Sequence, residues 1–156
     1  MATRSTIALE FADGTVHQVY CHWDGYLEHN GLILQEHYLD PFKVRNLIDL
    51  GGLSILRPEV GVKRPFDNPG LYGSPEYIAF QNLYGNQCCF YTRDRGEKLI
   101  VHKFNDYEDY LAHHQYEEYE YILRQVNGVA VWFVSEHGAI GYVTLETALI
   151  NMKETV

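Results

Sequence analysis

The chain has 156 residues, of which 46% are hydrophobic and 21% charged, and its formal net charge is −9. This length and composition are typical of a single globular domain over residues 1–156 and exclude an intrinsically disordered chain. The acidic balance excludes general binding to DNA or RNA, and apolar runs of only a few residues, such as VAVWFV, exclude a membrane-spanning helix.

The first predicted element is a β-hairpin. Two β-rich segments flank Asp13-Gly14, a pair favoured in type I′ turns. A turn centred on this pair places Arg4 opposite Trp23 on one face of the hairpin. The odd-numbered residues of 5–11 and the even-numbered residues of 16–22 then share the other, more apolar face.

Two helices are predicted next, over residues 25–39 and 41–50. The first has leucine and isoleucine among polar residues, with a weak point at Gly31. The second starts with an N-cap aspartate and a proline at the first helical position, Asp40-Pro41, and two glycines end it. Residues 57–77 contain four prolines and three glycines and show no periodicity, which predicts one long loop.

The second half of the chain is predicted to alternate hairpins with helices. Residues 88–104, CCFYT-RDRGE-KLIVHKF, predict a hairpin with a five-residue loop, and residues 119–136 predict another around Asn127-Gly128. A capping residue followed by acids indicates a helix over residues 105–114. Thr144 is the expected cap of a C-terminal helix.

Together these elements predict an α+β fold. Three hairpins give a mostly antiparallel sheet of about six strands, with three to four helices packed mainly on one face. The thiols of Cys21, Cys88 and Cys89 are an odd number, and adjacent cysteines rarely bridge. The N-terminal segment lacks an apolar signal-peptide core, so we expect reduced thiols and a cytoplasmic protein.

The stretch YCHWDGYLEHN places cysteine, histidine, aspartate and aromatic residues close together. Cys21 and His22 are neighbours on a strand and point to opposite faces, which disfavours a nucleophile–base pair. His22 with Asp24 is left as the possible core of a small hydrolase-like enzyme. The alternative is a structural corner in which Asp24-Gly25 turns the chain. None of the eight histidines has the spacing of a metal site, and neither a metal nor a cofactor is expected.

The long loop is the candidate ligand site, and the alternative is a solvated loop whose aromatic residues pack onto the core. Residues 43–103 carry nine basic against six acidic residues, so this part of the chain is positive within an acidic protein. Guanidinium and ammonium groups near aromatic rings can hold a phosphate and stack a base. The predicted ligand-binding residues are Arg4, Trp23, Tyr26, Arg57, Lys63, Arg64 and Tyr72. A second subunit would complete this site.

The stretch NDYEDYLAHHQYEEYEY is the alternative candidate. It sets acids among tyrosines, and such a face could dock a basic patch of a protein. Its alternation also fits a half-buried strand. The predicted interface residues are Asp106, Glu108, Asp109, Glu117, Glu118 and Glu120.

Residues 3–31 resemble the opening of a family of small bacteriophage and bacterial proteins. Those openings have a TR-[ST]-T-I strand, a D-G turn and a strand that ends in H-W-D-G-Y-P. The match includes Thr3, Arg4, Thr6, Ile7, Asp13, Gly14 and residues 22–26, whereas Leu27 stands where the family has proline. The resemblance covers about a fifth of the chain and implies a viral or mobile-element origin, hence the cytoplasm of a host bacterium.

The leading hypothesis is a phage-encoded, non-enzymatic protein that counters bacterial defence by sequestering a small anionic, nucleotide-derived signal. The runner-up is an inhibitor that binds a host or defence protein through the acidic face. An enzyme that uses His22 and Asp24 ranks third. We expect no membrane and no general nucleic-acid partner, and a homo-oligomer under the leading hypothesis.

Overall fold

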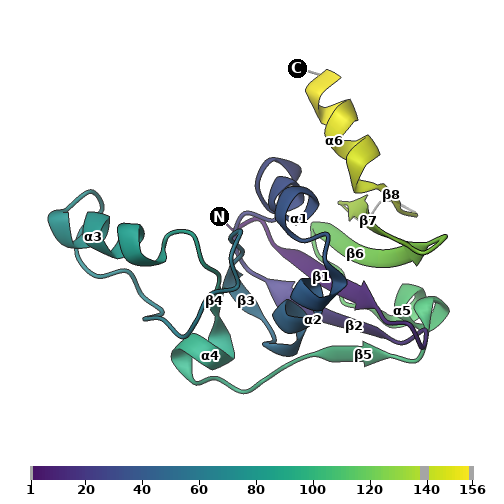
Figure 1. Cartoon of the computed structure of the whole chain (residues 1–156), viewed down its shortest axis with the longest axis horizontal. Coiled ribbons are helices and arrows are strands. Elements are labelled where there is room, and N and C mark those ends of the chain that lie inside the picture. The colour runs from purple at the N-terminus through teal and green to yellow at the C-terminus, as the bar shows by residue number, and fades with distance from the viewer. Residues whose placement is uncertain (1, 138–140, 155–156) are drawn as a thin grey trace.

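The computed structural model describes residues 2–137 and 141–154, and within them the fold is α+β, as predicted (Figure 1). One sheet of eight strands has the order β4-β3-β2-β1-β6-β7-β8, and β5 also pairs with β2. The strands are β1 (Ser5–Glu10), β2 (Val16–Cys21), β3 (Leu53–Ile55), β4 (Cys89–Phe90), β5 (His102–Phe104), β6 (Tyr119–Val126), β7 (Val129–Glu136) and β8 (Val143–Thr144).

Six α-helices and one π-helical turn accompany this sheet in the described part of the chain. They are η1 (Leu27–Gly31), α1 (Leu32–His37), α2 (Pro41–Asp49), α3 (Pro75–Tyr84), α4 (Tyr91–Arg95), α5 (Tyr107–His113) and α6 (Leu145–Glu154). Among the described residues, none of these helices has the length and apolar character needed to cross a bilayer.

The sheet is mixed, which corrects the prediction of a mostly antiparallel sheet of six strands. The central strand β1 pairs antiparallel with β2 on one side and parallel with β6 on the other. The parallel pair joins Ser5 to Tyr119. Turn residues specify only the strands that a short turn connects, so a pair formed by distant segments leaves no turn signal.

The register of the first hairpin differs from the predicted one by one residue. Its strands pair Ser5 with Cys21 and Ile7 with Val19. The loop closes instead between Phe11 and Thr15, where the Phe11 N–H donates to the Thr15 carbonyl at 2.8 Å. Since side chains alternate between the two faces, this shift of one residue places the even-numbered residues of both strands on the same face.

The predicted pairing of Arg4 with Trp23 is wrong for the same reason. Beyond Cys21 the chain leaves β1, and the N–H groups of His22 and Trp23 donate to the carbonyls of Leu53 and Ser54. Trp23 therefore lies beside β3.

The hairpin at Asn127-Gly128 is confirmed, with positive φ angles of 53° and 79° at these residues. The hairpin predicted over residues 88–104 is wrong, because the chain forms helix α4 after β4, and β5 pairs with β2 instead. The carboxylate of Asp94 accepts the N–H groups of Phe90 and Arg64 at 2.7 and 2.9 Å. This tertiary contact stabilises the helical turn.

Helices α2 and α6 start at the predicted caps, whereas Asp106 rather than Asn105 caps α5. Asp40 accepts the N–H of Phe42 at 3.0 Å, and Thr144 accepts that of Thr147 at 3.2 Å. The predicted first helix consists of η1 continued by α1. Helix α3 was not predicted. It begins in the last three residues of the predicted loop, where Ser74 caps it and Pro75 is its first residue, and it continues to Tyr84.

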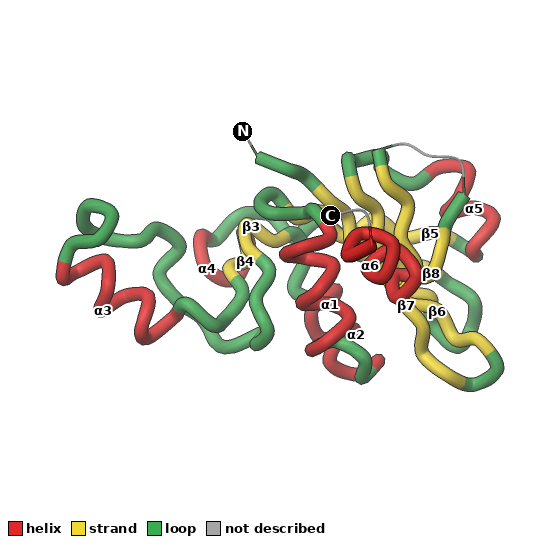
Figure 2. The backbone as a smooth tube through the Cα atoms, turned by 90° about the horizontal axis from the view of Figure 1, so that it is seen from above, coloured by secondary structure: helices red, strands yellow, loops and turns green. Residues whose placement is uncertain are grey.

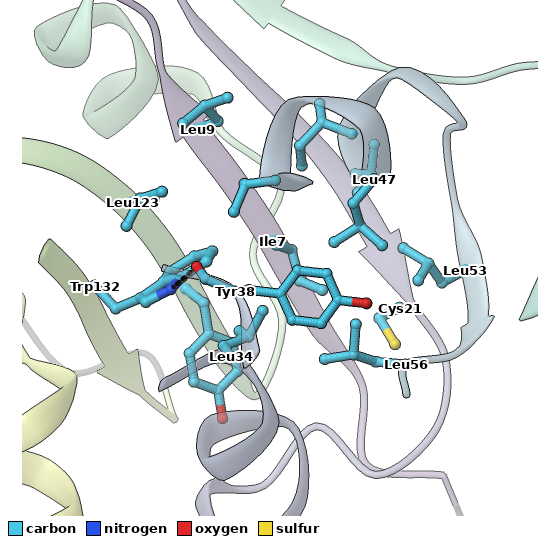
Figure 3. Close-up of a cluster of buried hydrophobic side chains, with 14 of the residues drawn as sticks. Ile7, Leu9, Cys21, Leu34, Tyr38, Leu47, Leu53, Leu56, Leu123 and Trp132 are labelled. Atoms are coloured by element: carbon cyan, nitrogen blue, oxygen red, sulfur yellow. Dashed lines mark hydrogen bonds between the residues drawn. The ribbon is translucent and has the colours of Figure 1, made fainter. Parts of the chain in front are cut away.

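The two faces of the sheet are covered differently. Helices α1, α2 and α6 lie along one face, whereas α5 lies against the other (Figure 2). The main hydrophobic core is on the first face, where the indole N–H of Trp132 donates to the carbonyl of Tyr38 at 2.9 Å (Figure 3). Its buried members from the sheet are Ile7, Leu9, Val19, Cys21, Leu53, Phe90, Tyr121, Leu123, Trp132 and Val134. We call this the covered face and its opposite the open face.

Residues 57–87, which we call the arm, extend with α3 away from the sheet in both views (Figures 1 and 2). Arg64 holds the arm together, because its guanidinium donates to the carbonyls of Tyr84 and Gln87 at 3.2 and 3.1 Å. Its side chain also lies over the rings of Phe80 and Tyr84.

Candidate ligand pocket on the open face

A pocket of about 280 Å³ lies on the open face. Its floor is formed by Thr6 of β1 with Gln18 and Tyr20 of β2. One wall comes from α4 and the segment that follows it, and the other from residues 115–117. The residues that line it are Thr6, Gln18, Val19, Tyr20, Gly52, Tyr91, Thr92, Glu97, Lys98, Ile100, His102, Gln115 and Glu117.

The hydroxyl of Thr6 is the most informative group in this pocket. Thr6 is 1% exposed, and its Oγ1 has no hydrogen-bond partner among the described residues. A buried hydroxyl without a partner costs about 1–3 kcal/mol, so such groups are rare in native proteins. Asn68 in the arm has the other buried atom of this kind in the described chain. Thr6 therefore brings a buried, unsatisfied hydroxyl to the floor of the pocket, where a shift of its side chain would let it donate to or accept from a ligand.

Gln18 fixes one wall of the pocket. Its side chain is fully buried, and its amide forms two hydrogen bonds with the backbone of Gln115. Nε2 donates to the carbonyl at 3.2 Å, and Oε1 accepts the N–H at 3.1 Å. A side-chain amide that pairs in this way substitutes for a strand partner. The segment 115–117 is thus held over the sheet.

Two tyrosines supply the aromatic surfaces. Tyr20 and Tyr91 both line the pocket, and burial raises the pKa of both phenols above the usual value. Both rings are therefore neutral near pH 7. The Tyr20 hydroxyl lies 2.6 Å from Nδ1 of His22, so it is already paired. The ring of Tyr20 is left as a flat apolar surface.

Charged groups of both signs surround the pocket. Lys98 and His102 line it, and in the described chain no hydrogen bond or ion pair engages either side chain. Burial raises the pKa of Glu117, and the positive charge of Arg4 opposes that rise. The charge of Arg4 also acts on the phenol of Tyr20. The pocket can thus receive a ligand with an anionic group near Lys98 and His102 and a hydrogen-bond donor near Glu117.

A buried polar network supports the wall at residues 115–117. Nδ1 of His114 donates to the Tyr110 carbonyl at 2.6 Å, and its Nε2 lies 3.0 Å from a carboxylate oxygen of Glu120. The same oxygen accepts the hydroxyl of Tyr142 at 3.1 Å, and the other one accepts the N–H of Glu117. Burial lowers the pKa of His114, but the hydrogen bond and charge of Glu120 outweigh it, so the pKa is raised.

The H-W-D-G-Y segment forms a structural corner. Asp24 has a φ of 58°, and a Cβ on Gly25 would lie 2.7 Å from Cβ of Ser5, so only glycine fits there. Buried Asn30 donates to Ser5 and to the Trp23 carbonyl. Asp24 and Gly25 are thus the residues whose backbone conformation and close packing form this corner.

The same corner determines which groups the side chains of His22 and Asp24 contact. The side chain of Asp24 accepts the hydroxyl of Tyr26 at 3.3 Å, while Nδ1 of His22 faces Tyr20. The structure does not bring His22 and Asp24 into a hydrogen-bonded pair.

The residues predicted for the long loop are separated by the fold. Arg57 donates to Nε2 of His29 at 3.1 Å and to the Gly85 carbonyl, close to Tyr26. Arg64 is 7% exposed and is occupied by carbonyls within the arm. Lys63 and Tyr72 are exposed on the arm, and Trp23 contacts His22. Of this set, Arg4 is the residue whose charge acts on Tyr20 and Glu117 of the pocket.

The predicted acidic face is also divided. Glu120 is buried in the His114 network, and Glu117 lines the pocket. Asp106 caps α5, and Asp109 accepts the Asn105 N–H and contacts His113. Asp106, Glu108 and Glu118 are exposed, whereas Glu120 is buried, so the six residues do not form one continuous acidic surface.

Sequence reasoning missed Thr6, Gln18, Tyr20, Lys98 and His102 as site residues. In the observed register, Thr6 pairs with Tyr20 and Gln18 with His102, so these residues share one face. Polar residues that alternate with apolar ones in both strands are the signal that could have found them. The one-residue error in the hairpin register placed Gln18 and Tyr20 on the apolar face.

Comparison with protein-family models, with curated proteins and with solved structures found no match.

Proposed function

We propose that the protein binds a small anionic, nucleotide-like molecule, without chemical turnover, in the pocket on the open face. The observation that carries this proposal is a pocket of about 280 Å³ whose floor includes Thr6, a residue with a buried hydroxyl that has no partner among the described residues. A ligand that reaches Thr6 would satisfy a buried polar group that the fold leaves unpaired.

The chemistry around Thr6 supports a nucleotide-like ligand. The rings of Tyr20 and Tyr91 offer surfaces for a flat base. Lys98 and His102 can contact a phosphate, and Glu117 can bind a ribose hydroxyl or a base amine. Ligand pockets usually hold about 300–1,000 Å³, so this pocket suits a single nucleotide unit better than two.

The resemblance of residues 3–31 to small bacteriophage proteins supports a role for this binding in countering bacterial defence. A protein that captures a nucleotide signal stoichiometrically needs a closed binding site and no catalytic pair. The pocket's tyrosine, lysine and histidine side chains support such capture.

Native mass spectrometry and calorimetric titration test the proposal. We expect the protein to bind AMP, a cyclic mononucleotide or an ADP-ribose-derived nucleotide with one ligand per pocket. Lys98→Ala and His102→Ala should each weaken this binding about tenfold, since each removes a charge-assisted contact. A protein that binds none of these nucleotides would overturn the proposal.

Lys103→Ala is the matched control. Lys103 follows His102 on β5, and it lies beside His17 and Asp49 in a different hollow. Its substitution removes a cation from the same strand without removing a pocket contact, so affinity should change less than twofold. Equal losses in the His102 and Lys103 variants would show that overall charge, and not the pocket, determines binding.

A further inference from the structure

Glu117 is the acid of the pocket lining that has no partner. Its carboxylate oxygens take part in no hydrogen bond or ion pair among the described residues, whereas Glu97, the other acid of the lining, is paired with Arg95. Glu117 is half-buried, but its side-chain oxygens keep accessible surface, unlike the hydroxyl of Thr6. A ligand in the pocket can therefore contact this carboxylate.

The backbone on both sides of Glu117 is fixed by hydrogen bonds. On one side the amide of Gln18 holds the preceding segment, and on the other the Tyr119 N–H donates to the Arg4 carbonyl at 3.4 Å. The N–H of Glu117 itself donates to the buried carboxylate of Glu120 at 3.3 Å. The chain thus presents the Glu117 carboxylate from a preorganised position, which lowers the entropic cost of binding.

The charge near Glu117 favours a carboxylate that accepts hydrogen bonds. Burial raises the pKa of Glu117, and the positive charge of Arg4 opposes that rise. Arg4 is exposed and forms no ion pair with Glu117 in the described part of the chain, so it acts at a distance and leaves both oxygens free. An ionised carboxylate only accepts hydrogen bonds, so Glu117 requires donors from a ligand.

Glu117 and the cationic side chains lie on opposite sides of the pocket. His102 belongs to β5, which pairs with the edge of β2 that faces away from β1. The segment of Glu117 leads into β6, which pairs with the far edge of β1. At least two strand spacings, roughly 10 Å, therefore separate the two groups. A mononucleotide whose base lies over Tyr20 can span them, with its phosphate at Lys98 and His102.

A carboxylate distinguishes the bases by the donors on their edges. Guanine presents a ring N–H and an exocyclic amine side by side, so both carboxylate oxygens can accept a hydrogen bond. Adenine and cytosine place a ring nitrogen with a lone pair beside the amine, and uracil flanks its ring N–H with two carbonyls. In these three bases a carboxylate oxygen faces another acceptor, and this repulsion disfavours them.

We propose that the pocket selects a guanine mononucleotide, in which Glu117 recognises the base and Lys98 and His102 hold the phosphate. This inference rests on the proposed function and narrows its ligand class. Adenine nucleotides still bind through the phosphate and the ring of Tyr20. They bind more weakly because they give the carboxylate one hydrogen bond instead of two.

Calorimetric titration of the wild type with GMP, IMP and AMP tests the selection. IMP has the ring N–H of GMP but lacks the exocyclic amine, so it isolates one of the two hydrogen bonds. We expect IMP to bind about tenfold more weakly than GMP, and AMP about 30-fold more weakly. This series compares ligands on one protein and does not depend on the folding of any variant.

Glu117→Gln tests the residue. The amide keeps the size of the side chain but replaces one acceptor with a donor, so the affinity for GMP should fall about tenfold, while that for AMP should stay within about threefold. Glu118→Gln is the matched control. It removes the same charge from the adjacent, exposed residue outside the pocket lining, and the preference for GMP over AMP should be unchanged.

The measured affinities separate this proposal from the proposed function. If none of the three nucleotides binds, the proposed function fails and the selection fails with it. If all three bind with equal affinity and Lys98→Ala weakens each of them, the pocket binds nucleotides and only the selection is overturned. A preference for GMP that persists in Glu117→Gln would overturn the assignment of Glu117.

Discussion

Different interactions stabilise the two faces of the sheet. The covered face buries leucine, isoleucine, valine and tryptophan under three helices, so its stability comes from apolar packing. The open face is covered by α5, by α4 with the segment after it and by residues 115–117, and its buried residues include Thr6, Gln18 and Glu120. The side chains of Gln18 and Glu120 are hydrogen-bonded, whereas the Thr6 hydroxyl has no partner among the described residues. The pocket on the open face lies over Thr6, the buried residue whose hydroxyl is unsatisfied.

The largest expected effect comes from the covered face. Trp132→Ala should cost about 3–5 kcal/mol of unfolding free energy, because it leaves a large cavity and removes the donor to the Tyr38 carbonyl. Phe133→Ala changes the next residue on β7, which is half-buried against the open face, and should cost clearly less. Urea unfolding followed by circular dichroism measures both. Equal losses would show that both faces are packed alike.

The second prediction concerns the hydrogen bonds of the open face. Gln18→Leu should cost about 2 kcal/mol, since the N–H and the carbonyl of Gln115 both lose a partner. Gln115→Ala is the control, because Gln18 contacts only the backbone of that residue, and its effect should stay within about 0.5 kcal/mol. Urea unfolding compares the two variants. A stabilising Gln18→Leu would mean that the open face tolerates apolar packing.

Thr6→Val should increase the free energy of unfolding, in contrast to the two substitutions above. It replaces the unpartnered hydroxyl with a methyl group of similar shape, and we expect a gain of about 1 kcal/mol in unfolding free energy. Ligand affinity should fall in the same variant, as expected where a site is kept at the expense of stability. Thr144→Val should lose about 1 kcal/mol, since that hydroxyl caps α6. Thermal and urea unfolding test both signs.

The smallest expected effect is the pH dependence of two histidines. The pKa of His114 is raised, so its contribution to stability is present below the unfolded pKa near 6.5 and is lost as the pH rises through the folded value. Burial and the charge of Lys103 lower the pKa of His17, so its contribution is present above about 6.5 and is lost as the pH falls.

Melting temperatures at pH 5.5 and pH 8 measure this difference. We compare the melting temperature at pH 8 minus that at pH 5.5 in each variant and in wild type. This difference should be larger in His114→Gln than in wild type, and smaller in His17→Gln. Shifts of the same sign in both variants would contradict the opposite environments of these histidines.

Local sequence signals predicted the local structure well. Asn127-Gly128, Asp40-Pro41 and Thr144 each act within a few residues, and the hairpin and helices that they predicted are present. The signal at Asp13-Gly14 predicted a hairpin but not its register. A longer loop and a two-residue turn differ by one position, which is enough to exchange the two faces.

The candidate site could not be predicted from single segments. Thr6, Tyr91, His102 and Glu117 come from four distant parts of the chain, and no spacing motif links them. Arg64 illustrates the opposite error. Its charge suggested a ligand contact, but the arm buries it against carbonyls that come from α3 and the segment after it.

By itself, the sequence determined the α+β class, one hairpin in full register and the starts of α2 and α6, because turns and caps depend on residues within one or two turns of the chain. The tertiary structure alone decided the parallel pairing of β1 with β6, the helix α4 in place of a hairpin and the position of the pocket. These features depend on which distant segments pack together, and the free energy of such packing is shared by residues that no local pattern connects.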